Sequence, residues 1–289
     1  MAPIIRTENL SHTYSVGTPF ERTAIRAVDF CAQKGEFIGL IGHTGSGKST
    51  LIQHLNGLLT PAEGKVFFNE QDICASKEVT RNIRFQVGLV FQYPEYQLFE
   101  ETVERDIAFG PKNMGLDEAE IAARVQKAAA LVGLTEAQLE QSPFTLSGGQ
   151  KRRAAIAGVM AMRPRVLILD EPTAGLDPCG RDEIMAGILQ FRQETEATVI
   201  LVTHSMEEIA RTADRVVVMH NGEITMSGTR SEVFARAEAL SAIGLDVPEV
   251  TRVAMRLRNL GLDLPADIFT IDQATRAILA LKGGRSDAT

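Results

Sequence analysis

A glycine-rich segment near residue 45 combines the residue types that bind nucleotide phosphates. It follows an apolar stretch, EFIGLIG, and precedes a stretch with helical spacing, STLIQHLNGL. Glycines let backbone N–H groups approach a phosphate closely, and the amino end of the helix adds the positive end of its dipole. The segment predicts a nucleotide-binding loop made of Gly42, His43, Thr44, Gly45, Ser46, Gly47, Lys48, Ser49 and Thr50.

Two residues of this loop and two downstream acids could act together on a nucleoside triphosphate. Lys48 is placed to reach the β- and γ-phosphates, and the Ser49 hydroxyl is placed to bind Mg²⁺. An acidic Mg²⁺ partner is expected at the end of a neighbouring strand, where the run VLILD supplies Asp170. Glu171 follows directly, and we interpret it as the residue that polarises the attacking water. Strand alternation would direct its side chain away from that of Asp170.

Three further side chains are candidates for the same site. His204 closes the run TVILVTH, which we take as the last core strand, and it could contact the γ-phosphate and orient the water. Gln92 follows the strand VGLVF and could touch Mg²⁺ or water. Tyr14 could stack on adenine through its ring. Each has a simpler alternative, namely a structural histidine, an exposed loop glutamine and an ordinary exposed tyrosine.

The elements that would hold these residues alternate in type along the chain. Residues 4–90 read as short strands, including IIRTENL, AIRAVDFCA and GKVFFNE, separated by glycine turns. From about residue 92 to 162 the pattern is helical, as in DEAEIAARVQKAAALVGL and the shorter TEAQLEQ. RVLILD and TVILVTH then flank the helical GRDEIMAGILQFRQE. This order predicts a parallel sheet with its ligand beyond the carboxyl ends of the strands.

The tail after residue 235 predicts two short amphipathic helices around the link GLDLPADIF. We therefore divide the chain into residues 1–235, containing a helical subdomain at about 92–162, and an extension at residues 236–289. The extension is interpreted either as a packing appendage or as an oligomerisation surface. The residues expected to share a helical face are Val250, Val253, Ala254, Leu257 and Leu260 in the first helix, and Ile271, Ala274, Ile278 and Leu281 in the second.

The composition is that of an ordinary globular protein of 289 residues, with 44% hydrophobic and 23% charged residues. A formal net charge of −7 argues against nucleic acid as a partner, because such binding usually needs a basic face. Three widely spaced cysteines form no CxxC pair and favour free thiols in a reducing compartment. No apolar run reaches the length of a transmembrane helix, so we expect a soluble cytoplasmic protein.

LSGGQ, residues 146–150, is a second glycine motif that could bind an anion at the start of a helix. The chain contains, in this order, GHTGSGKST, Gln92, LSGGQ, VLILDEP, the GLDP run and His204. In these motifs the chain resembles the ATP-binding-cassette ATPases over roughly residues 4–235. The resemblance implies an α/β P-loop NTPase fold of this ABC-ATPase type. Such a fold has a RecA-like parallel-sheet core, an antiparallel β subdomain and an α-helical subdomain, here followed by a small C-terminal helical extension.

The same resemblance explains why one chain has two glycine motifs. In that family LSGGQ faces the γ-phosphate held by a second subunit, in a head-to-tail dimer with two ATP molecules between the subunits. ATP bridges the dimer and its hydrolysis removes the bridge. The residues implied to act on the partner's nucleotide are Leu146, Ser147, Gly148, Gly149, Gln150 and Asp177.

Longer segments resemble the ATPases of energy-coupling-factor transporters, which import vitamins and transition-metal ions. These segments are TYSVGTPFERTAIRAVDF, FQYPEYQLFEETVERDIAFGPKNMG, LSGGQKRRAAIAGVMAM and DEPTAGLDP, and they are closest to the second of two paralogous ATPases. The resemblance implies Mg²⁺-dependent ATP hydrolysis at the cytoplasmic face of the cell membrane. It also implies a paralogous ATPase as partner, with a homodimer as the alternative, a transmembrane coupling protein and a substrate-binding membrane subunit. The extension would contribute to the ATPase dimer.

The segment after Gln92 could form part of the contact with a membrane subunit. Its aromatic and apolar side chains, among many acids, suit a groove that receives an arginine-bearing helix; a locally packed loop is the alternative. These side chains are Tyr93, Pro94, Tyr96, Leu98 and Phe99.

Three other functions remain as alternatives. A conventional ABC importer or exporter would use an ATPase of the same kind with different membrane domains. A non-transport ABC ATPase acting on DNA or ribosomes would usually carry long insertions or two fused cassettes, and neither fits in 289 residues. A nucleotide-binding scaffold without turnover would have no need of Glu171 and His204.

Overall fold

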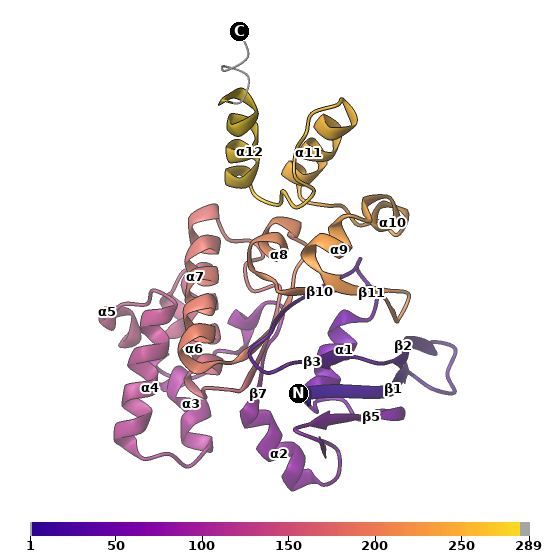
Figure 1. The fold of residues 1–289 in the computed structure, drawn as a ribbon. Coiled ribbons are helices and arrows are strands. Elements are labelled where there is room, and N and C mark those ends of the chain that lie inside the picture. Colours follow the sequence, from indigo (N-terminus) through magenta and orange to yellow (C-terminus); the bar gives the residue numbers. More distant parts are fainter. Residues whose placement is uncertain (1, 284–289) are drawn as a thin grey trace.

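The computed structural model describes residues 2–283. Its centre is a six-stranded sheet in the order β11-β10-β4-β9-β8-β7, in which all neighbours are parallel except β10 and β11 (Figure 1). The strands are β4 (Phe37–Ile41), β7 (Val87–Val90), β8 (Val166–Asp170), β9 (Thr198–Val202), β10 (Arg215–His220) and β11 (Glu223–Thr229). The predicted parallel sheet is confirmed.

The end of this sheet differs from the sequence-based expectation. The strand TVILVTH ends at Val202, so Thr203 and His204 lie in the loop beyond it. It is also not the last strand, because β10 pairs in parallel with β4 and β11 continues the sheet. The run RVVVMH, which forms β10, is mostly apolar but was not among the strands predicted from the sequence.

Side chains of the central strands pack alternately on the two faces of the sheet, as the two-residue repeat of a strand requires. In β4, Phe37 and Ile41 contribute to one core, together with helical residues between positions 103 and 191, whereas Ile38 and Leu40 contribute to a second core on the other face. Both faces are therefore covered, which accounts for the continuously apolar sequence of these strands.

The second sheet is antiparallel and joins β2, β1, β5 and β6, with β3 paired to β1. Its strands are β1 (Ile5–Tyr14), β2 (Arg22–Val28), β3 (Cys31–Ala32), β5 (Glu63–Phe68) and β6 (Gln71–Asp72). AIRAVDFCA, expected as one strand, is divided between β2 and β3. Both pieces pair with β1, which places Tyr14 at the end of β1 opposite Arg22 at the start of β2.

Two helices connect strands of one sheet to strands of the other. Helix α1 (Lys48–Leu55) begins in the glycine-rich loop, as expected. Helix α2 (Lys77–Gln86) was not expected, because residues 4–90 read as short strands and turns. The signal for α2 is its N-cap: the Ser76 hydroxyl accepts a hydrogen bond from the backbone N–H of Val79. Only Ile83 of this helix is buried, so its apolar periodicity is weak.

The remaining helices of the main body lie to one side of the parallel sheet (Figure 1). The region at 92–162, expected to be helical, contains the short 3₁₀ helices η1 and η2. The apolar face expected in this region lies on α4. Its residues Ile121, Val125, Ala128 and Val132 are buried, whereas Leu131 is only partly buried. The bounds are η1 (Pro94–Gln97), α3 (Val103–Asn113), α4 (Glu118–Leu131), α5 (Glu136–Leu139), η2 (Pro143–Thr145) and α6 (Gly148–Ala161).

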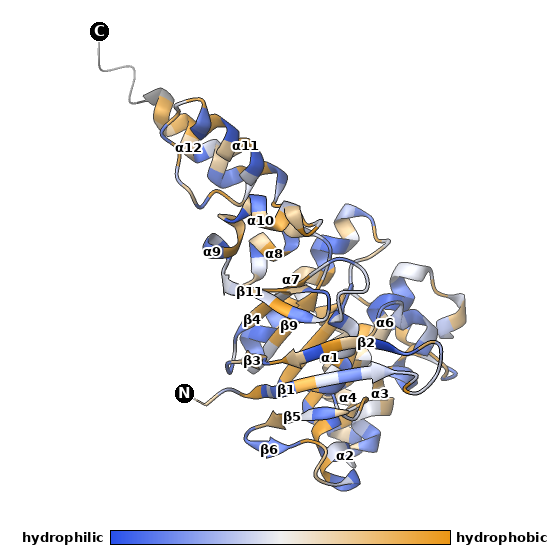
Figure 2. Ribbon diagram, turned by 90° about the vertical axis from the view of Figure 1, so that its right-hand side faces the viewer, coloured by the Kyte–Doolittle hydropathy of each residue, from blue (hydrophilic) through white to orange (hydrophobic). Residues whose placement is uncertain are grey.

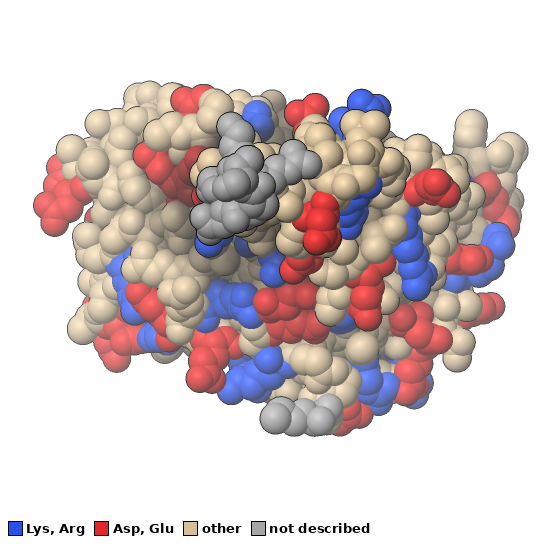
Figure 3. Space-filling model, turned by 45° about the horizontal axis from the view of Figure 1, so that its top comes forward, with Lys and Arg blue, Asp and Glu red and all other residues tan. Residues whose placement is uncertain are grey.

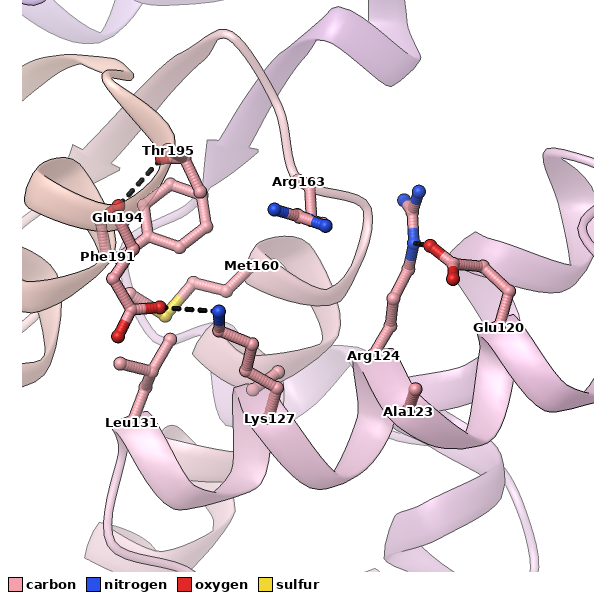
Figure 4. Close-up of a pocket in the computed structure, with 11 residues that line it drawn as sticks. Glu120, Ala123, Arg124, Lys127, Leu131, Met160, Arg163, Phe191, Glu194 and Thr195 are labelled. Atoms are coloured by element: carbon pink, nitrogen blue, oxygen red, sulfur yellow. Dashed lines mark hydrogen bonds and ion pairs between the residues drawn. The ribbon is translucent and has the colours of Figure 1, made fainter.

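A small cavity of about 90 Å³ lies where α4 and the end of α6 meet α7 (Pro178–Thr195). Figure 4 shows charged side chains around an apolar floor that includes Met160 and Phe191. Lys127 of α4 pairs with Glu194 of α7 at 2.7 Å, which ties the helical region to the sheet.

Helix α8 (Met206–Thr212) connects β9 to β10. The helices that follow β11 are α9 (Arg230–Phe234), α10 (Ala237–Ala242), α11 (Glu249–Asn259) and α12 (Ile271–Gly283). Helices α11 and α12 project from the main body, as the two helices predicted for the tail (Figure 1). Leu240, Leu245 and Phe269 belong to the main core, so the segment after residue 235 is packed on the sheet domain both before α11 and between α11 and α12.

The apolar faces expected in the tail are only partly correct. Ala254 is buried in a cluster with Leu264 and Ile268. The expected residues that pack against this cluster are Val250, Leu257, Ala274 and Leu281. The residues that were expected on the same faces but are exposed are Val253, Leu260, Ile271 and Ile278. In Figure 2 both helices carry hydrophilic and hydrophobic residues around their circumference. Figure 3, in which the end of the molecule that carries α11 and α12 comes forward, shows acidic and basic side chains interspersed over the surface.

Candidate nucleotide-binding site

A cleft of about 430 Å³ opens at the carboxyl ends of the parallel strands. Because β4, β7, β8 and β9 run in the same direction, the loops that follow them meet at one edge of the sheet. The cleft brings together most of the residues that the sequence singled out. It is lined by Tyr14, Arg22, Ala24, Thr44, Gly45, Gly47, Lys48, Ser49, Thr50, Gln92, Asp170, Glu171 and His204.

The loop between β4 and α1 has the backbone shape of a phosphate-binding loop. Gly45 and Gly47 have φ of 81° and 102°, a region that residues with a Cβ rarely adopt. A Cβ on Gly47 would also lie 2.6 Å from the carbonyl oxygen of Ala24. The Ser46 hydroxyl is buried without a hydrogen-bond partner. Gly42 and His43 belong to the loop but do not line the cleft, and the His43 ring packs on that of His220.

Lys48, at the start of α1, is held by its own loop. Its Nζ donates to the carbonyl oxygens of Gly42 and His43 at 2.6 and 3.0 Å. Burial lowers the pKa of this amine, while the charges of Asp170 and Glu171 oppose the effect. A buried ammonium with few counter-charges is poised to bind an anion, because a phosphate would supply the missing negative charge.

Asp170 and Ser49 form a pair of oxygen ligands. The Ser49 hydroxyl donates to Asp170 Oδ2 at 3.2 Å, joining the start of α1 to the end of β8. Burial raises the pKa of Asp170, and the hydrogen bond from Ser49 opposes it. A buried carboxylate beside a hydroxyl fits Mg²⁺, which favours oxygen ligands and is usually held by one or two carboxylates together with substrate phosphates.

Glu171 is held from two sides by the loops after β7 and β9. Its Oε1 lies 2.9 Å from His204 Nε2, and Gln92 Nε2 donates to its Oε2 at 3.3 Å. The residue has φ of 51°, and its N–H donates to the carbonyl of Val202 at 2.8 Å. This left-handed turn, rather than strand alternation alone, separates its side chain from that of Asp170. A carboxylate fixed in this way at the mouth of the cleft can accept a proton from a water molecule.

Tyr14 forms the outer wall of the cleft. Its hydroxyl lies 3.3 Å from that of Thr50 on α1, which fixes the end of β1 against that helix. The ring is 39% exposed and contacts His12 edge-on, with the ring centroids 4.5 Å apart. A partly exposed aromatic ring in this position can stack on a nucleobase.

The second glycine motif lies outside this cleft. Ser147 is the N-cap of α6: its hydroxyl accepts from Gln150 N–H at 3.3 Å, and Gln150 Oε1 accepts from Ser147 N–H at 2.9 Å. Asp177 caps α7 by accepting from Gly180 N–H at 2.7 Å. A Cβ on Gly149 would lie 3.3 Å from Leu176, so the two motifs adjoin. The structure therefore separates Leu146–Gln150 and Asp177 from the other predicted site residues.

Two residues of the cleft were missed by sequence reasoning. Arg22 and Ala24 lie on β2 and complete the wall beside Tyr14 and the glycine-rich loop. Both lie in the segment TYSVGTPFERTAIRAVDF, but that segment gave neither of them a role. Their place in the cleft depends on the pairing of β1 with β2, which their spacing in the sequence does not reveal.

Comparisons with known proteins assign this chain to a family. The family model described as "ABC transporter" matches residues 25–174. The protein named Energy-coupling factor transporter ATP-binding protein EcfA2 from Clostridium perfringens is 55% identical over 278 residues, covering 96% of this chain and 98% of that protein. Its namesake from Caldanaerobacter subterraneus subsp. tengcongensis is 54% identical over 275 residues, with 95% and 96% covered.

Solved structures agree with this assignment. A Clostridium perfringens protein described as part of an ABC transporter complex superposes with a TM-score of 0.74 at 38% identity, covering 90% of this chain and 98% of that one. A dimeric ATP-binding cassette in a post-hydrolysis state, bound to ADP and Pi, gives a TM-score of 0.72 at 26% identity, with 78% and 98% covered. The P-loop ABC-ATPase fold is confirmed, and the chain belongs to the ABC transporter family, among the energy-coupling factor transporter ATP-binding proteins.

Proposed function

We propose that this chain binds and hydrolyses ATP in the cleft described above, as the energy-supplying subunit of an energy-coupling factor transporter. The observation that carries the proposal is the juxtaposition of three groups at one sheet edge. They are the phosphate-binding loop with Lys48, the Ser49–Asp170 pair, and a Glu171 carboxylate fixed by Gln92 and His204. A pure nucleotide-binding scaffold would need only the first of these.

Each residue has a definite part in the proposed reaction. Loop amides and Lys48 bind the phosphates, and Tyr14 stacks on the base. Mg²⁺, held by Ser49 and Asp170 with Gln92 nearby, would neutralise charge on the phosphate oxygens. Glu171 accepts a proton from the attacking water, while His204 orients the carboxylate and contacts the γ-phosphate. The attack of water on the γ-phosphorus breaks its bond to the bridging oxygen and yields ADP and phosphate.

A second ATPase completes the proposed site. The start of α6 offers the Ser147 hydroxyl with the Gly148 and Gly149 amides, a typical anion-binding helix end that lies outside the cleft of its own chain. We infer that it binds the γ-phosphate held by a partner, with Asp177 at the same seam. The partner is a paralogous ATPase, with a second copy of this chain as the alternative outcome.

Membrane partners would attach beside the nucleotide site. Tyr93, Tyr96 and Phe99 follow Gln92 directly and are all exposed, and Phe99 packs edge-on against the exposed Phe109. We infer that this surface receives a helix of the transmembrane coupling protein on the cytoplasmic face of the membrane, with a separate membrane subunit binding a vitamin or a transition-metal ion. Within residues 2–283, no helix is long and apolar enough to span a bilayer.

Residues 236–289 are proposed to contribute to the ATPase dimer. Helices α11 and α12 project from the body and leave Leu260 and Ile271 largely exposed, at 78% and 75%. Because these apolar side chains are not buried within the single chain, their burial against a partner would stabilise a dimer.

Affinity purification from gently solubilised membranes would test the assembly. The expected result is copurification of a related ATPase, a polytopic coupling protein and small membrane subunits, with ATP hydrolysis by the purified complex. Copurification of paired permease domains instead would identify a conventional ABC transporter. Recovery of the ATPase without a membrane protein would contradict the transport function.

A further inference from the structure

Arg22 is a cationic side chain in the nucleotide cleft to which no motif assigns a role. It lies at the start of β2 and lines the cleft with Tyr14 and the glycine-rich loop. Its guanidinium reaches that loop, because a Cβ placed on Gly45 would lie only 3.1 Å from Arg22 Nη2. Gly45 therefore leaves space for this side chain beside the backbone that binds phosphate.

The guanidinium of Arg22 is available for a ligand. Within residues 2–283, no ion pair or hydrogen bond engages it, and the side chain is exposed to solvent. Most other arginines near the sheets are paired, as Arg6 is with Glu70 and Arg215 with Glu36. An arginine presents several N–H donors in a planar fork that matches phosphate oxygens, and it stays charged at all physiological pH values.

The charges of the cleft favour a phosphate ligand for this group. Asp170 and Glu171 lie near Lys48, whereas Arg22 extends from β2 of the antiparallel sheet to Gly45. Lys48 and Arg22 are the lysine and the arginine among the lining residues. A polyphosphate bound along the glycine-rich loop would therefore meet both side chains.

Strand register fixes which part of a nucleotide Arg22 can reach. Tyr14 and Arg22 are directly paired on neighbouring antiparallel strands, so their side chains are adjacent. Tyr14 is anchored to α1 through Thr50, and Arg22 extends from the next strand to Gly45. With the base on Tyr14 and the terminal phosphate at Lys48, the guanidinium lies beside the intervening part of the ligand.

We propose that Arg22 is a nucleotide-positioning residue that binds the α- and β-phosphates from the β-subdomain wall. This inference rests on the proposed binding of ATP in the cleft. The antiparallel sheet would then contact the nucleotide at two places, through Tyr14 at the base and through Arg22 at the phosphates.

Equilibrium binding of ADP and adenosine to full-length variants tests the proposal. Replacement of Arg22 by Gln is expected to weaken ADP binding about tenfold, the effect of losing one charged contact, and to change adenosine binding less than about twofold. Arg22→Lys should recover part of the ADP affinity. The difference between wild type and Arg22→Gln should shrink in high salt because the contact is exposed.

A matched control is Arg26→Gln on the same strand. Arg26 is exposed, and its Nη1 lies 3.8 Å from Glu223 Oε1. It does not line the cleft. It should bind ADP like the wild type. Equal losses for ADP and adenosine, no loss for ADP, or a Lys variant as weak as the Gln variant would each overturn the role of Arg22. Failure of the wild type to bind ADP, or an unaltered Lys48→Ala variant, would instead overturn the nucleotide site itself.

Discussion

The Glu171 carboxylate and the His204 imidazole, which follow different strands of the parallel sheet, are joined by a 2.9 Å contact between Oε1 and Nε2. Gln92 reaches the other oxygen of the same carboxylate at 3.3 Å. The acid thus depends on two loops for its position, and it lines the cleft. Glu171, the proposed proton acceptor, is thus held by Gln92 and His204 and not by the glycine-rich loop that is proposed to bind the phosphates.

Glu171→Gln should abolish turnover while preserving ATP binding. Removal of a general base typically costs a factor of about 10² to 10⁴ in rate. Glutamine retains the shape and can still interact with His204, so the fold and the affinity for ATP should change little. Steady-state hydrolysis and equilibrium ATP binding measure the two quantities separately. Glu118→Gln, an exposed carboxylate at the start of α4, is the control; undiminished hydrolysis by Glu171→Gln would refute the assigned role.

Ser147→Asp should prevent ATP-driven dimerisation without damaging α6. Aspartate caps a helix as well as serine does, so the hydrogen bond now accepted from Gln150 N–H can be kept. A carboxylate facing the partner's γ-phosphate adds like-charge repulsion, which should weaken dimerisation by more than about tenfold. Light scattering with ATP, in a background carrying Glu171→Gln, reports the dimer.

The matched control for Ser147→Asp is Ser76→Asp, which alters the equivalent cap of α2 far from the second glycine motif. That variant should dimerise normally. If Ser147→Asp dimerised like its parent, the start of α6 would not face the partner's nucleotide.

Glu95→Ala should destabilise the fold strongly. Glu95 binds Arg152 through two hydrogen bonds of 2.9 and 3.1 Å, connecting η1, next to Gln92, with α6. The arginine side chain is only 5% exposed, so removal of the acid leaves a buried, unpaired charge. Such changes cost about 3 kcal/mol of unfolding free energy or more. Denaturant titration measures the loss.

Glu101→Ala provides the comparison for Glu95→Ala. Its salt bridge to Arg105 is exposed and joins residues one helical turn apart, so its loss should cost less than about 1 kcal/mol. Equal stability of the two variants would show that the Glu95–Arg152 pair contributes no more than a surface contact.

His54 should make the stability of the protein pH-dependent. The imidazole is fully buried and burial lowers its pKa from the ordinary value of 6.5, with the neighbouring His12 adding to the effect. Below pH 6.5 the unfolded chain therefore binds a proton that the folded chain does not. Stability contributed by the neutral form is present above pH 6.5 and is lost as the pH falls towards the folded-state pKa, by up to about 1.4 kcal/mol per pH unit.

His54→Asn should remove this part of the pH dependence. Asparagine can still donate to the Thr50 carbonyl, which accepts a 2.8 Å hydrogen bond from His54 Nδ1, but it does not titrate. The variant should be less stable at pH 7.5 because it leaves a void, yet lose less stability between pH 7.5 and 5.5. Unfolding free energies at several pH values decide this, and parallel curves for the two proteins would contradict the assignment.

The candidate nucleotide site could be predicted from the sequence because each of its motifs is local. The glycines of residues 42–47 meet the steric demands of one loop, and the order of apolar strands and helices places Asp170, Glu171 and Gln92 at strand ends that share an edge. Their identification as predicted site residues required no knowledge of distant contacts, although their catalytic roles stay predictions.

Features that depend on pairing between distant segments could not be predicted from the sequence. Arg22 enters the cleft because β2 pairs with β1, and Glu171 acquires its orientation from Gln92 and His204, which follow other strands. The tail shows the same limit: its helices follow from a 3.6-residue repeat, but which apolar side chains are buried depends on how α11 and α12 meet, so Leu260 and Ile271 are exposed. Periodicity indicates which residues share a face, whereas burial requires a partner surface that lies elsewhere in the chain or in another subunit.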